Sequence, residues 1–505
     1  MSVAILRSRA QIGVEAPPVT IEVFLSGGLP KFSIVGLPET AVRESKDRVR
    51  GAISSSGFKF PQERITVSLG PAEMRKTGGR FDLPIALGIL AAQKLVPGYA
   101  FATHEFYGEL ALNGDIRPVA GILPAALMAD RAAHALIVPR GNTAEATIAA
   151  RRVFAADSLL QVTAHLNGST PIAPAEPDSP PACSPGGPDL AEVRGQPLAR
   201  RALEIAAAGR HNILLVGPPG TGKSMLACRL PGILPPLSHD EAIEAAAVKS
   251  VLGQRLDPER WRTPPFRAPH HTASAVALVG GGTDPRPGEI SRAHNGVLFL
   301  DELPEFNRHV LEVLREPLES GTITISRAGG QADFPARFQL VAAMNPCPCG
   351  YLGDPRGDCR CSADRIRAYR ARISGPLLDR IDIHVQVQRP PKEALLPTAR
   401  PGEPSAAVAH RVLEARAMQL ARAGVCNAEL GGERLYDVVD AEPAAWRLLE
   451  EAIDRFAMSA RAYVRVQRVA RTIADLEGSR RVRAKHVGEA LGLRYLDRRV
   501  DMPVG

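Results

Sequence analysis

The sequence lacks any hydrophobic run of the length that crosses a membrane. Its most apolar stretch, LPIALGILAA at residues 83–92, is far shorter than the roughly 20 residues that a spanning helix needs. The N-terminal stretch MSVAILRSRAQIGVEAPP is interrupted by Arg, Gln and Pro, so it does not have the charged-then-apolar order of a secretory signal. We therefore expect a cytoplasmic protein with no membrane partner.

Internal repeats and a strong excess of either charge are also missing. The 62 Lys and Arg residues against 54 Asp and Glu give a net charge of +8, which fits a nucleic-acid partner but equally a generally basic proteome. A hydrophobic fraction of 45% and a charged fraction of 23% are those of an ordinary globular protein. At 505 residues the chain is too long for one core, and about two to four domains are expected.

The chain divides into four stretches that differ in composition and pattern. Residues 168–189 are rich in Pro, Ala and Ser, which predicts a linker. Before it, residues 1–167 mix short strand-like and helical stretches, which is typical of an α+β domain. After it, residues 190–389 alternate short apolar strands with helices and predict a parallel α/β sheet. Residues 390–505 have helical periodicity and predict a helical bundle.

A phosphate-binding loop is the clearest motif. The stretch GPPGTGKS at residues 217–224 follows the apolar strand NILLV and fits the G-x-x-x-x-G-K-[ST] pattern in its strand–loop–helix context. Backbone N–H groups would surround the phosphates, Lys223 would reach the β- and γ-phosphates, and Ser224 would bind Mg²⁺. The nucleotide-binding residues predicted in this loop are Gly217, Pro218, Pro219, Gly220, Thr221, Gly222, Lys223 and Ser224.

Two later strands end in polar residues that complete such a site. GVLFLDE at residues 296–302 runs from apolar residues into two carboxylates. Asp301 would hold Mg²⁺, and Glu302 would activate the attacking water. Asn345 ends the strand FQLVAAMN, where it would polarise the same water or sense the γ-phosphate, or else cap a turn before Pro346.

Several long stretches carry a family resemblance: GLPKFSIVGLPETAVRESKDRVRGAI, GGRFDLPIALGIL, GELALNGDIRPVAGILPAALMA, FRAPHHTAS, GEISRAHNGVLFLDELPEF, AAMNPCPCGY, SGPLLDRIDI and SARAYVRVQRVARTIADLEG. They resemble the competence-associated (ComM/YifB-type) branch of the magnesium-chelatase-like AAA+ ATPases. The resemblance implies a Lon-protease-like (ribosomal S5 domain 2-like) α+β domain at residues 1–167, a P-loop α/β AAA+ core at 190–389 and a helical lid at 390–505.

The resemblance also implies roles for two arginines. Arg380 in LLDRID is similar to the arginine finger that completes a neighbouring subunit's site, and Arg461 in SARAYVR is similar to the lid arginine that senses the γ-phosphate. A planar, permanently charged guanidinium suits charge spread over phosphate oxygens. The alternatives are a salt bridge to Asp379 or Asp382 for Arg380 and an exposed helix position for Arg461. A finger supplied to a neighbour implies a ring, and the family's assembly is a homo-hexamer.

The N-terminal domain is not expected to be a protease. A Lon-type protease needs a Ser nucleophile and a Lys base, whereas RKTGGRFDLPIALG at residues 75–88 offers Lys76 and no Ser. Asp82 stands near the expected nucleophile position, and a carboxylate does not replace Ser in this chemistry. We expect a folded, non-proteolytic module.

For function, the resemblance implies an ATP-driven DNA motor. The expected activity is that of a hexameric helicase on single-stranded or branched DNA that promotes branch migration during natural transformation, with recombination proteins as further partners. Arg327, near the tip of a predicted hairpin at residues 322–338, is a candidate DNA contact or a solvated arginine. His270 and His271 are adjacent and are expected to pack rather than bind metal. The alternative function is a chelatase-like chaperone or remodelling ATPase acting on a tetrapyrrole-insertion or protein partner.

Four of the seven cysteines fall in CPCGYLGDPRGDCRC at residues 347–361. Clustered cysteines in a reducing compartment favour metal over disulfide. Cys347, Cys349, Cys359 and Cys361 form two Cys-x-Cys pairs that suit tetrahedral Zn²⁺. An iron–sulfur cluster and free thiols remain open alternatives. The cofactors expected for the whole chain are ATP, Mg²⁺ and Zn²⁺.

Overall fold

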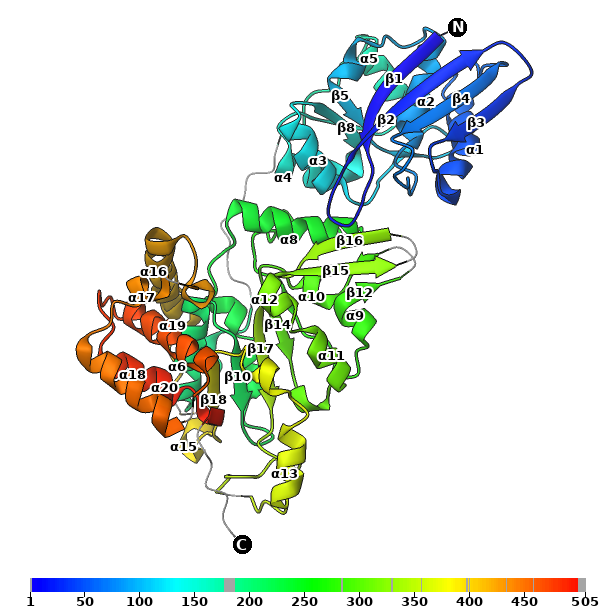
Figure 1. The fold of residues 1–505 in the computed structure, drawn as a ribbon. Helices are drawn as coiled ribbons and strands as arrows, with labels where there is room; N and C mark the ends of the chain where they lie inside the picture. The colour runs from blue at the N-terminus through cyan, green and yellow to red at the C-terminus, as the bar shows by residue number, and fades with distance from the viewer. Residues whose placement is uncertain are drawn as a thin grey trace. The chain divides into compact units, whose positions relative to one another are not determined.

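The computed structural model of the chain divides into two compact units (Figure 1). The described residues are 2–176, 187–282, 285–327, 330–355, 357–396, 398, 400–432, 434–456 and 458–497. Unit 1 comprises Met1–Cys183, His239–Trp261 and Ala328–Phe334, and unit 2 comprises Ser184–Ser238, Arg262–Arg327 and Pro335–Gly505. Within the described ranges, no helix has both the length and the apolar character that a membrane crossing needs.

A seven-stranded sheet forms the centre of unit 1, in the order β3-β4-β2-β1-β5-β8-β9. Neighbours β1–β2 and β2–β4 are antiparallel, whereas β3–β4, β1–β5, β5–β8 and β8–β9 are parallel. Along β2 the side chains of Val19, Ile21, Val23 and Leu25 are buried in alternation, as expected of a strand with one face on the core. The strands are β1 (Ser2–Arg9), β2 (Pro18–Ser26), β3 (Lys31–Val35), β4 (Arg64–Gly70), β5 (His104–Phe106), β8 (Ala135–Pro139) and β9 (Val153–Ala156), with the separate pair β6 (Glu109–Leu110) and β7 (Ile116–Arg117).

The helices of unit 1 include one that comes from much later in the chain. Helix α2 packs on β1 and β2 with ten of its 11 residues buried, because it is apolar on every side. Helix α8 follows the phosphate loop in sequence, yet its Ile243, Ala246 and Ala247 pack with Leu123 of α3. The segment 239–261 lies inside the range predicted for the AAA+ core, and in the structure it belongs to unit 1. The helices are α1 (Thr40–Ser55), α2 (Asp82–Ala92), α3 (Ile122–Arg131), α4 (Thr143–Ala149), α5 (Leu159–Leu166) and α8 (His239–Val251).

Unit 2 contains a five-stranded, wholly parallel sheet in the order β11-β14-β17-β10-β18. Every residue of β10, β14 and β17 is buried, which confirms the mixed α/β architecture with a parallel sheet. The first strand in sequence, β10, lies between β17 and β18, so the strand order reverses there, and such switch points bind ligands at the carboxyl edge of the sheet. The strands are β10 (Ile213–Val216), β11 (Phe266–Arg267), β14 (Val297–Leu300), β17 (Gln339–Met344) and β18 (Ile383–Gln386).

The C-terminal helices share the core of this sheet. One hydrophobic cluster runs from Leu215 of β10 through Ala206 of α6 to Ile473 of α19 and Leu449 of α18, and Figure 1 shows α16 and α19 beside α6. These helices are α6 (Pro197–Gly209), α16 (Ser405–Ala423), α17 (Arg434–Val439), α18 (Pro443–Phe456), α19 (Ala460–Leu476) and α20 (Ala484–Gly492). The shorter elements of unit 2 are α7 (Lys223–Ala227), α9 (Ala275–Val279), α10 (Glu289–Arg292), α11 (Arg308–Val313), α12 (Pro317–Ser320), α13 (Ala363–Arg370), α14 (Gly375–Leu378), α15 (Lys392–Leu395), the strand pair β12 (Gly280–Gly281) with β13 (Arg286–Pro287), and β15 (Thr322–Arg327). Strand β16 (Gly330–Pro335) falls mostly in the segment Ala328–Phe334 of unit 1.

Candidate functional site

The predicted phosphate loop connects β10 to α7 at the switch point of the sheet. Gly217 has no room for a side chain, because an added Cβ would lie 2.2 Å from the carbonyl oxygen of Val387. Gly222 has a φ of 86°, in the left-handed region that favours glycine. The loop is fixed further by Gln196, whose Nε2 donates to the Thr221 carbonyl at 2.5 Å. Gly217 and Gly222 therefore allow the backbone conformation and the close packing that the loop needs.

Lys223 points into the loop with its three donors engaged. Its Nζ donates to the carbonyl oxygens of Gly217 and Pro218 at 2.7 and 2.9 Å and to Oδ1 of Asn345 at 3.0 Å. An ammonium has three N–H donors, so these contacts satisfy it. Burial lowers the pKa of Lys223, and the carboxylates of Asp301 and Glu302 oppose that shift. A phosphate oxygen that replaces one of these acceptors can therefore bind the Lys223 ammonium without a change in the direction of the side chain.

Ser224 and Asp301 meet on the other side of the loop. The Ser224 hydroxyl donates to Oδ2 of Asp301 at 2.5 Å, and Oδ1 of Asp301 accepts the backbone N–H of Glu302 at 2.9 Å. Hydroxyl and carboxylate oxygens are hard ligands of the type that Mg²⁺ prefers. The donor set therefore fits the predicted magnesium role of Ser224 and Asp301.

Glu302 stands at a sharp turn after β14 and has a histidine partner. Its φ of 53° is rare for a residue with a long side chain and marks a functional or constrained position. The side chain is 55% exposed, and its Oε2 lies 3.2 Å from Nδ1 of His271. His271 comes soon after β11, which pairs in parallel with β14, so the two strand ends bring His271 and Glu302 together.

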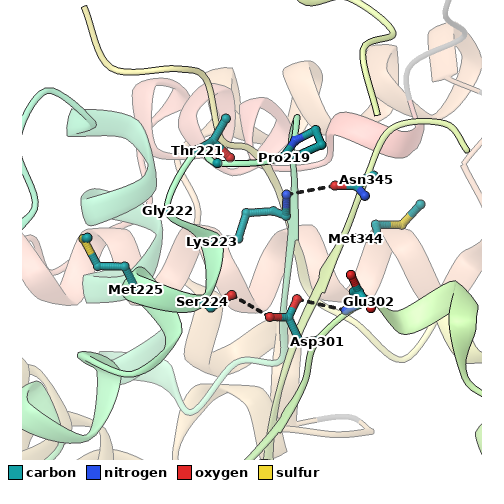
Figure 2. Close-up of a pocket in the computed structure, with 11 residues that line it drawn as sticks. Pro219, Thr221, Gly222, Lys223, Ser224, Met225, Asp301, Glu302, Met344 and Asn345 are labelled. Carbon is teal, nitrogen blue, oxygen red and sulfur yellow. Dashed lines mark hydrogen bonds between the residues drawn. The ribbon is translucent and has the colours of Figure 1, made fainter. Parts of the chain in front are cut away.

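These side chains line one pocket of about 350 Å³ (Figure 2). Asn345, directly after β17, faces Lys223 across it. The carboxyl ends of β10, β14 and β17 therefore supply the loop, the two carboxylates and the amide. The lining residues are Pro219, Gly220, Thr221, Gly222, Lys223, Ser224, Met225, Asp301, Glu302, Met344 and Asn345.

The predicted arginine finger, Arg380, and the predicted γ-phosphate sensor, Arg461, meet elsewhere in unit 2. Neither Arg380 nor Arg461 is among the described residues that line the pocket. Arg380 is only 6% exposed, and its Nη2 pairs with Oε1 of Glu319 in α12. Arg461 is 58% exposed, and its Nη2 lies 4.0 Å from the same Glu319 oxygen. One carboxylate thus serves both arginines, a partner that the sequence did not indicate.

A buried carboxylate connects the sheet of unit 2 to the C-terminal helices. Asp382, which directly precedes β18, has a side chain only 2% exposed and pairs with Arg465 of α19. Its Oδ2 also accepts the backbone N–H of Asn212 at 3.0 Å. Burial alone would raise the pKa of Asp382, but Arg465 and His211 hold it well below its usual range. The carboxylate therefore stays charged and joins α19 to the strand beside β10.

Arg327 ends β15, and its side chain lies outside the described residues. Its predicted contact with DNA therefore stays a prediction.

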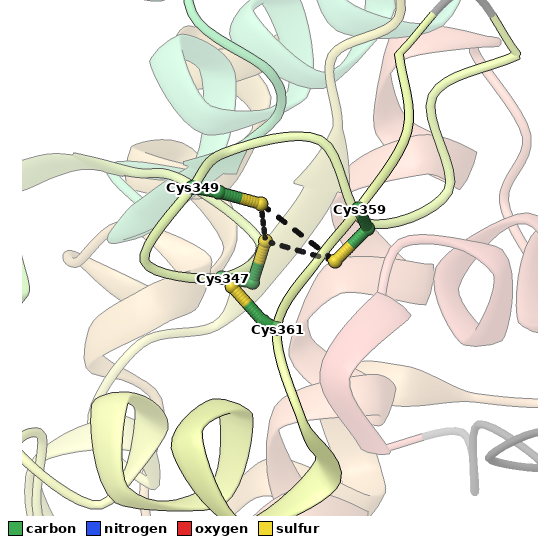
Figure 3. Close-up of side chains that lie close together, drawn as sticks. All are labelled: Cys347, Cys349, Cys359 and Cys361. Atoms are coloured by element: carbon green, nitrogen blue, oxygen red, sulfur yellow. Dashed lines mark hydrogen bonds between the residues drawn. The ribbon is translucent and has the colours of Figure 1, made fainter.

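The four clustered cysteines converge (Figure 3). One sulfur from each lies within 4.8 Å of the others, and Sγ of Cys347 is 3.4 Å from Cys349 and 3.7 Å from Cys359. A disulfide would need about 2.05 Å, whereas sulfurs around one tetrahedral ion with Zn–S bonds of about 2.3 Å lie about 3.8 Å apart. The donor set therefore fits a single metal ion better than disulfides.

Asp82 of unit 1, the residue that the sequence places near a protease nucleophile position, takes part in a buried salt bridge. Arg48 Nε donates to Oδ2 of Asp82 at 2.6 Å, and Oδ1 accepts a second bond from the same guanidinium at 3.1 Å. Burial raises the pKa of Asp82 to about 6, against the lowering effect of Arg48. Lys76 is buried, which lowers its pKa, and its Nζ donates to the Pro71 carbonyl. Both groups already have internal partners.

The sequence thus anticipated one part of the site and missed another. The structure brings together Lys223, Ser224, Asp301, Glu302 and Asn345, all of which follow apolar strands. It adds Gln196, His271 and Glu319, none of which ends a strand in a recognisable motif. The only signal for His271 was the phrase FRAPHHTAS, in which the two histidines were expected to pack.

Comparison with known proteins agrees with this geometry. Family matches cover most of the chain: residues 189–395 match the family described as magnesium chelatase, subunit ChlI. Residues 21–142 match subunit ChlI of Mg-chelatase, and residues 402–494 match its C-terminal family. A chloroplastic magnesium-chelatase subunit ChlI of Nicotiana tabacum is 28% identical over 156 residues, which is 26% of this chain and 37% of that protein.

Full-length relatives come from bacteria. The competence protein ComM of Haemophilus influenzae is 49% identical over 503 residues, covering 99% of this chain and 98% of that protein. The protein YifB of Salmonella typhimurium is 48% identical over 505 residues, with the same coverage of the two chains. With its phosphate loop at the switch point of a parallel sheet, the chain belongs to the ComM/YifB family of magnesium-chelatase-like, AAA+-type ATPases.

Proposed function

We propose that this chain is an ATP-hydrolysing motor that acts on DNA, as a homo-hexameric helicase that promotes branch migration in recombination. The observation that carries the ATPase part is the convergence of Lys223, Ser224, Asp301, Glu302 and Asn345 on one pocket. The DNA part rests on the competence function in the name of a full-length relative and on the net charge of +8.

In this proposal each side chain has one task. Lys223 exchanges an internal acceptor for β- and γ-phosphate oxygens, and Ser224 and Asp301 hold Mg²⁺, which neutralises charge on those oxygens. Glu302 takes the proton of the attacking water, and Asn345 orients that water or the γ-phosphate. Arg380 and Arg461 leave Glu319 for phosphate, Arg380 in the site of a neighbouring copy. Each guanidinium keeps an anionic partner in this exchange, because carboxylate and phosphate both accept its hydrogen bonds.

The test is ATP hydrolysis and three-stranded branch migration measured side by side with purified protein. Glu302→Gln should keep ATP binding and lose hydrolysis by about 10²-fold or more, and Lys223→Ala should lose both activities. Glu305→Gln is the matched control, since Glu305 is three residues away and pairs with Arg372 at 2.9 Å. Wild-type protein without branch migration, or full activity in Lys223→Ala, would contradict the proposal.

A second candidate is a chelatase-like chaperone or remodelling ATPase acting on a protein or tetrapyrrole-insertion partner. The family descriptions, which name a magnesium-chelatase subunit over three parts of the chain, favour it. Stimulation of ATP hydrolysis separates the two candidates. The DNA motor predicts stimulation by single-stranded DNA, and the alternative predicts stimulation by a porphyrin or a protein client.

We propose Zn²⁺ as the ion of the cysteine cluster. Four thiolates close a tetrahedral site and leave no open position for chemistry, which is typical of structural zinc. An iron–sulfur cluster would place several iron atoms between the thiolates and hold the sulfurs further apart than the 3.4 to 3.7 Å seen here. Elemental analysis of protein purified without added metal tests this; iron with sulfide, or four metal-free thiols, would refute it.

For unit 1 we propose a Lon-protease-like module without peptidase activity, used for assembly or for contact with DNA or a partner. The support is chemical: Asp82 is held by Arg48, Lys76 by the Pro71 carbonyl, and no Ser lies in residues 75–88. Peptidase activity that disappears in Lys76→Ala would overturn this proposal.

A further inference from the structure

The cysteine cluster is directly joined to the candidate nucleotide site. Cys347 comes two residues after Asn345, whose amide accepts a hydrogen bond from Lys223 at 3.0 Å. On the other side of the cluster, α13 begins soon after Cys361, and its last residue, Arg370, donates to the Pro346 carbonyl at 3.4 Å. The backbone between Asn345 and Cys347 is therefore held from both ends of the loop.

One residue of the cysteine loop contacts the phosphate loop itself. Gly350 follows Cys349, and an added Cβ would lie 2.6 Å from Cδ of Pro219 and 3.8 Å from Cγ of Asn345. Pro219 lines the pocket. The backbone at Gly350 therefore rests against the phosphate loop with no space for even a methyl group.

The rest of the cysteine loop is fixed to the core of unit 2. The carboxylate of Asp354, only 1% exposed, accepts from Nε of Arg389 at 2.8 Å. Gly350 itself closes a turn, because its N–H donates to the Cys347 carbonyl at 3.0 Å. Gly350 directly follows Cys349 and is hydrogen-bonded to Cys347, so its position depends on what holds the sulfurs of these two cysteines.

We propose that metal binding by Cys347, Cys349, Cys359 and Cys361 positions the phosphate loop through the Gly350–Pro219 contact, so that nucleotide affinity depends on the metal. This inference rests on the proposed ATP site. A bound ion fixes four points of the loop and holds Gly350 against Pro219 beside Lys223 and Asn345. Without the ion, four thiolates or thiols within 4.8 Å of one another repel or merely touch, and the phosphate loop loses this support.

Two glycines of the same loop give a matched test of the contact. Gly350 and Gly353 both have positive φ, of 86° and 76°, so alanine strains the backbone at either position. An added Cβ at Gly353 meets nothing within 4 Å. Gly350→Ala pushes against Pro219, and one of the two must move by about 1 Å to reach ordinary contact distance. Gly350→Ala is therefore expected to weaken nucleotide binding while Gly353→Ala does not.

The experiment is titration of the full-length protein with a fluorescent ATP analogue and Mg²⁺, with metal content measured on the same samples. Gly350→Ala should retain the metal and raise the Kd by about tenfold or more, and Gly353→Ala should stay within about twofold. Chelator-stripped protein and Cys359→Ser should lose metal and affinity together, and returned Zn²⁺ should restore only the stripped wild type. Cys426→Ser, a buried cysteine outside the cluster, is the control for thiol replacement.

The outcomes separate this inference from the proposed function. Equal affinities for Gly350→Ala and Gly353→Ala, or unchanged affinity after metal removal, would overturn the positioning role while leaving the ATP site intact. Metal-loaded wild type that binds no nucleotide would instead refute the ATP site, and this inference with it.

Discussion

The buried pair between Asp382 and Arg465 predicts a large stability effect from a small substitution. Asp382→Asn keeps the shape of the side chain but removes its charge, and leaves Arg465, 15% exposed, without a counter-ion. Removing one partner of a buried pair costs about 3–5 kcal/mol. The oxygen of the new amide would still accept from the Asn212 N–H, so we expect the lower end, about 3 kcal/mol.

The two tryptophans make this effect measurable in one unit at a time. The chain has two, Trp261 in unit 1 and Trp446 in unit 2. In a Trp261→Phe background, urea unfolding followed by fluorescence reports on unit 2. Asp440→Asn is the matched control, since Asp440 and Arg481 pair at 3.2 Å but are 45% and 50% exposed, and exposed pairs contribute about 1 kcal/mol or less.

The pH dependence of the free energy of unfolding is an independent test of the contribution of the Asp382 charge. Because the pKa of Asp382 is held well below its unfolded value, its contribution is present above about pH 4 and is lost only as pH falls further. The difference between wild type and Asp382→Asn should therefore be constant from about pH 8 to about pH 5, as a flat region of about 3 kcal/mol. A loss below about 1 kcal/mol at about pH 7, or equal losses in Asp382→Asn and Asp440→Asn, would refute the reasoning.

Three further predictions concern the candidate site and unit 1. His271→Ala should lower kcat of ATP hydrolysis by about tenfold with little change in KM, because it releases Glu302 from its orientation. An equal effect of His270→Ala, whose ring centroid lies 4.1 Å from that of His271, would argue against it. Glu319→Gln removes the charge shared by Arg380 and Arg461, so assembly measured by sedimentation should occur at lower protein concentration, and unchanged or weaker assembly would contradict this. The pKa of Asp82, raised to about 6, means that unit 1 binds more protons folded than unfolded between about pH 4 and 6, and its stability should fall by roughly 3 kcal/mol as pH rises across that range. Asp82→Asn should flatten that slope, as read from Trp261 fluorescence in a Trp446→Phe background.

The sequence predicted the parts of this molecule that depend on local pattern. The stretches NILLV, GVLFL and FQLVAAM are apolar throughout, and a parallel sheet buried on both faces needs such strands. Because parallel strands share one carboxyl edge, the residues that follow them, Lys223, Glu302 and Asn345 among them, could be expected to meet.

What the sequence could not predict depends on the course of loops and on the choice between partners. Helix α8 is rich in Ala and most of its residues after Glu241 are buried, and a composition of this kind shows only that a helix is buried and not against what. It packs on Leu123 of α3, more than a hundred residues earlier. Glu319 holds Arg380 and Arg461 through pairings across 61 and 142 positions, which no periodicity encodes.

The place of α8 has a consequence for how the chain can be divided. Unit 1 takes three separate segments of the chain, and unit 2 takes the three segments that follow each of them. A fragment that stopped at residue 183 would expose Leu123 and Leu127, which α8 and Trp261 cover, and a fragment that began at residue 184 would carry α8 without the partner for its apolar face. A cut at the linker would therefore not give two complete units, because the segment His239–Trp261 lies within the sequence that follows the phosphate loop and yet forms part of the core of unit 1.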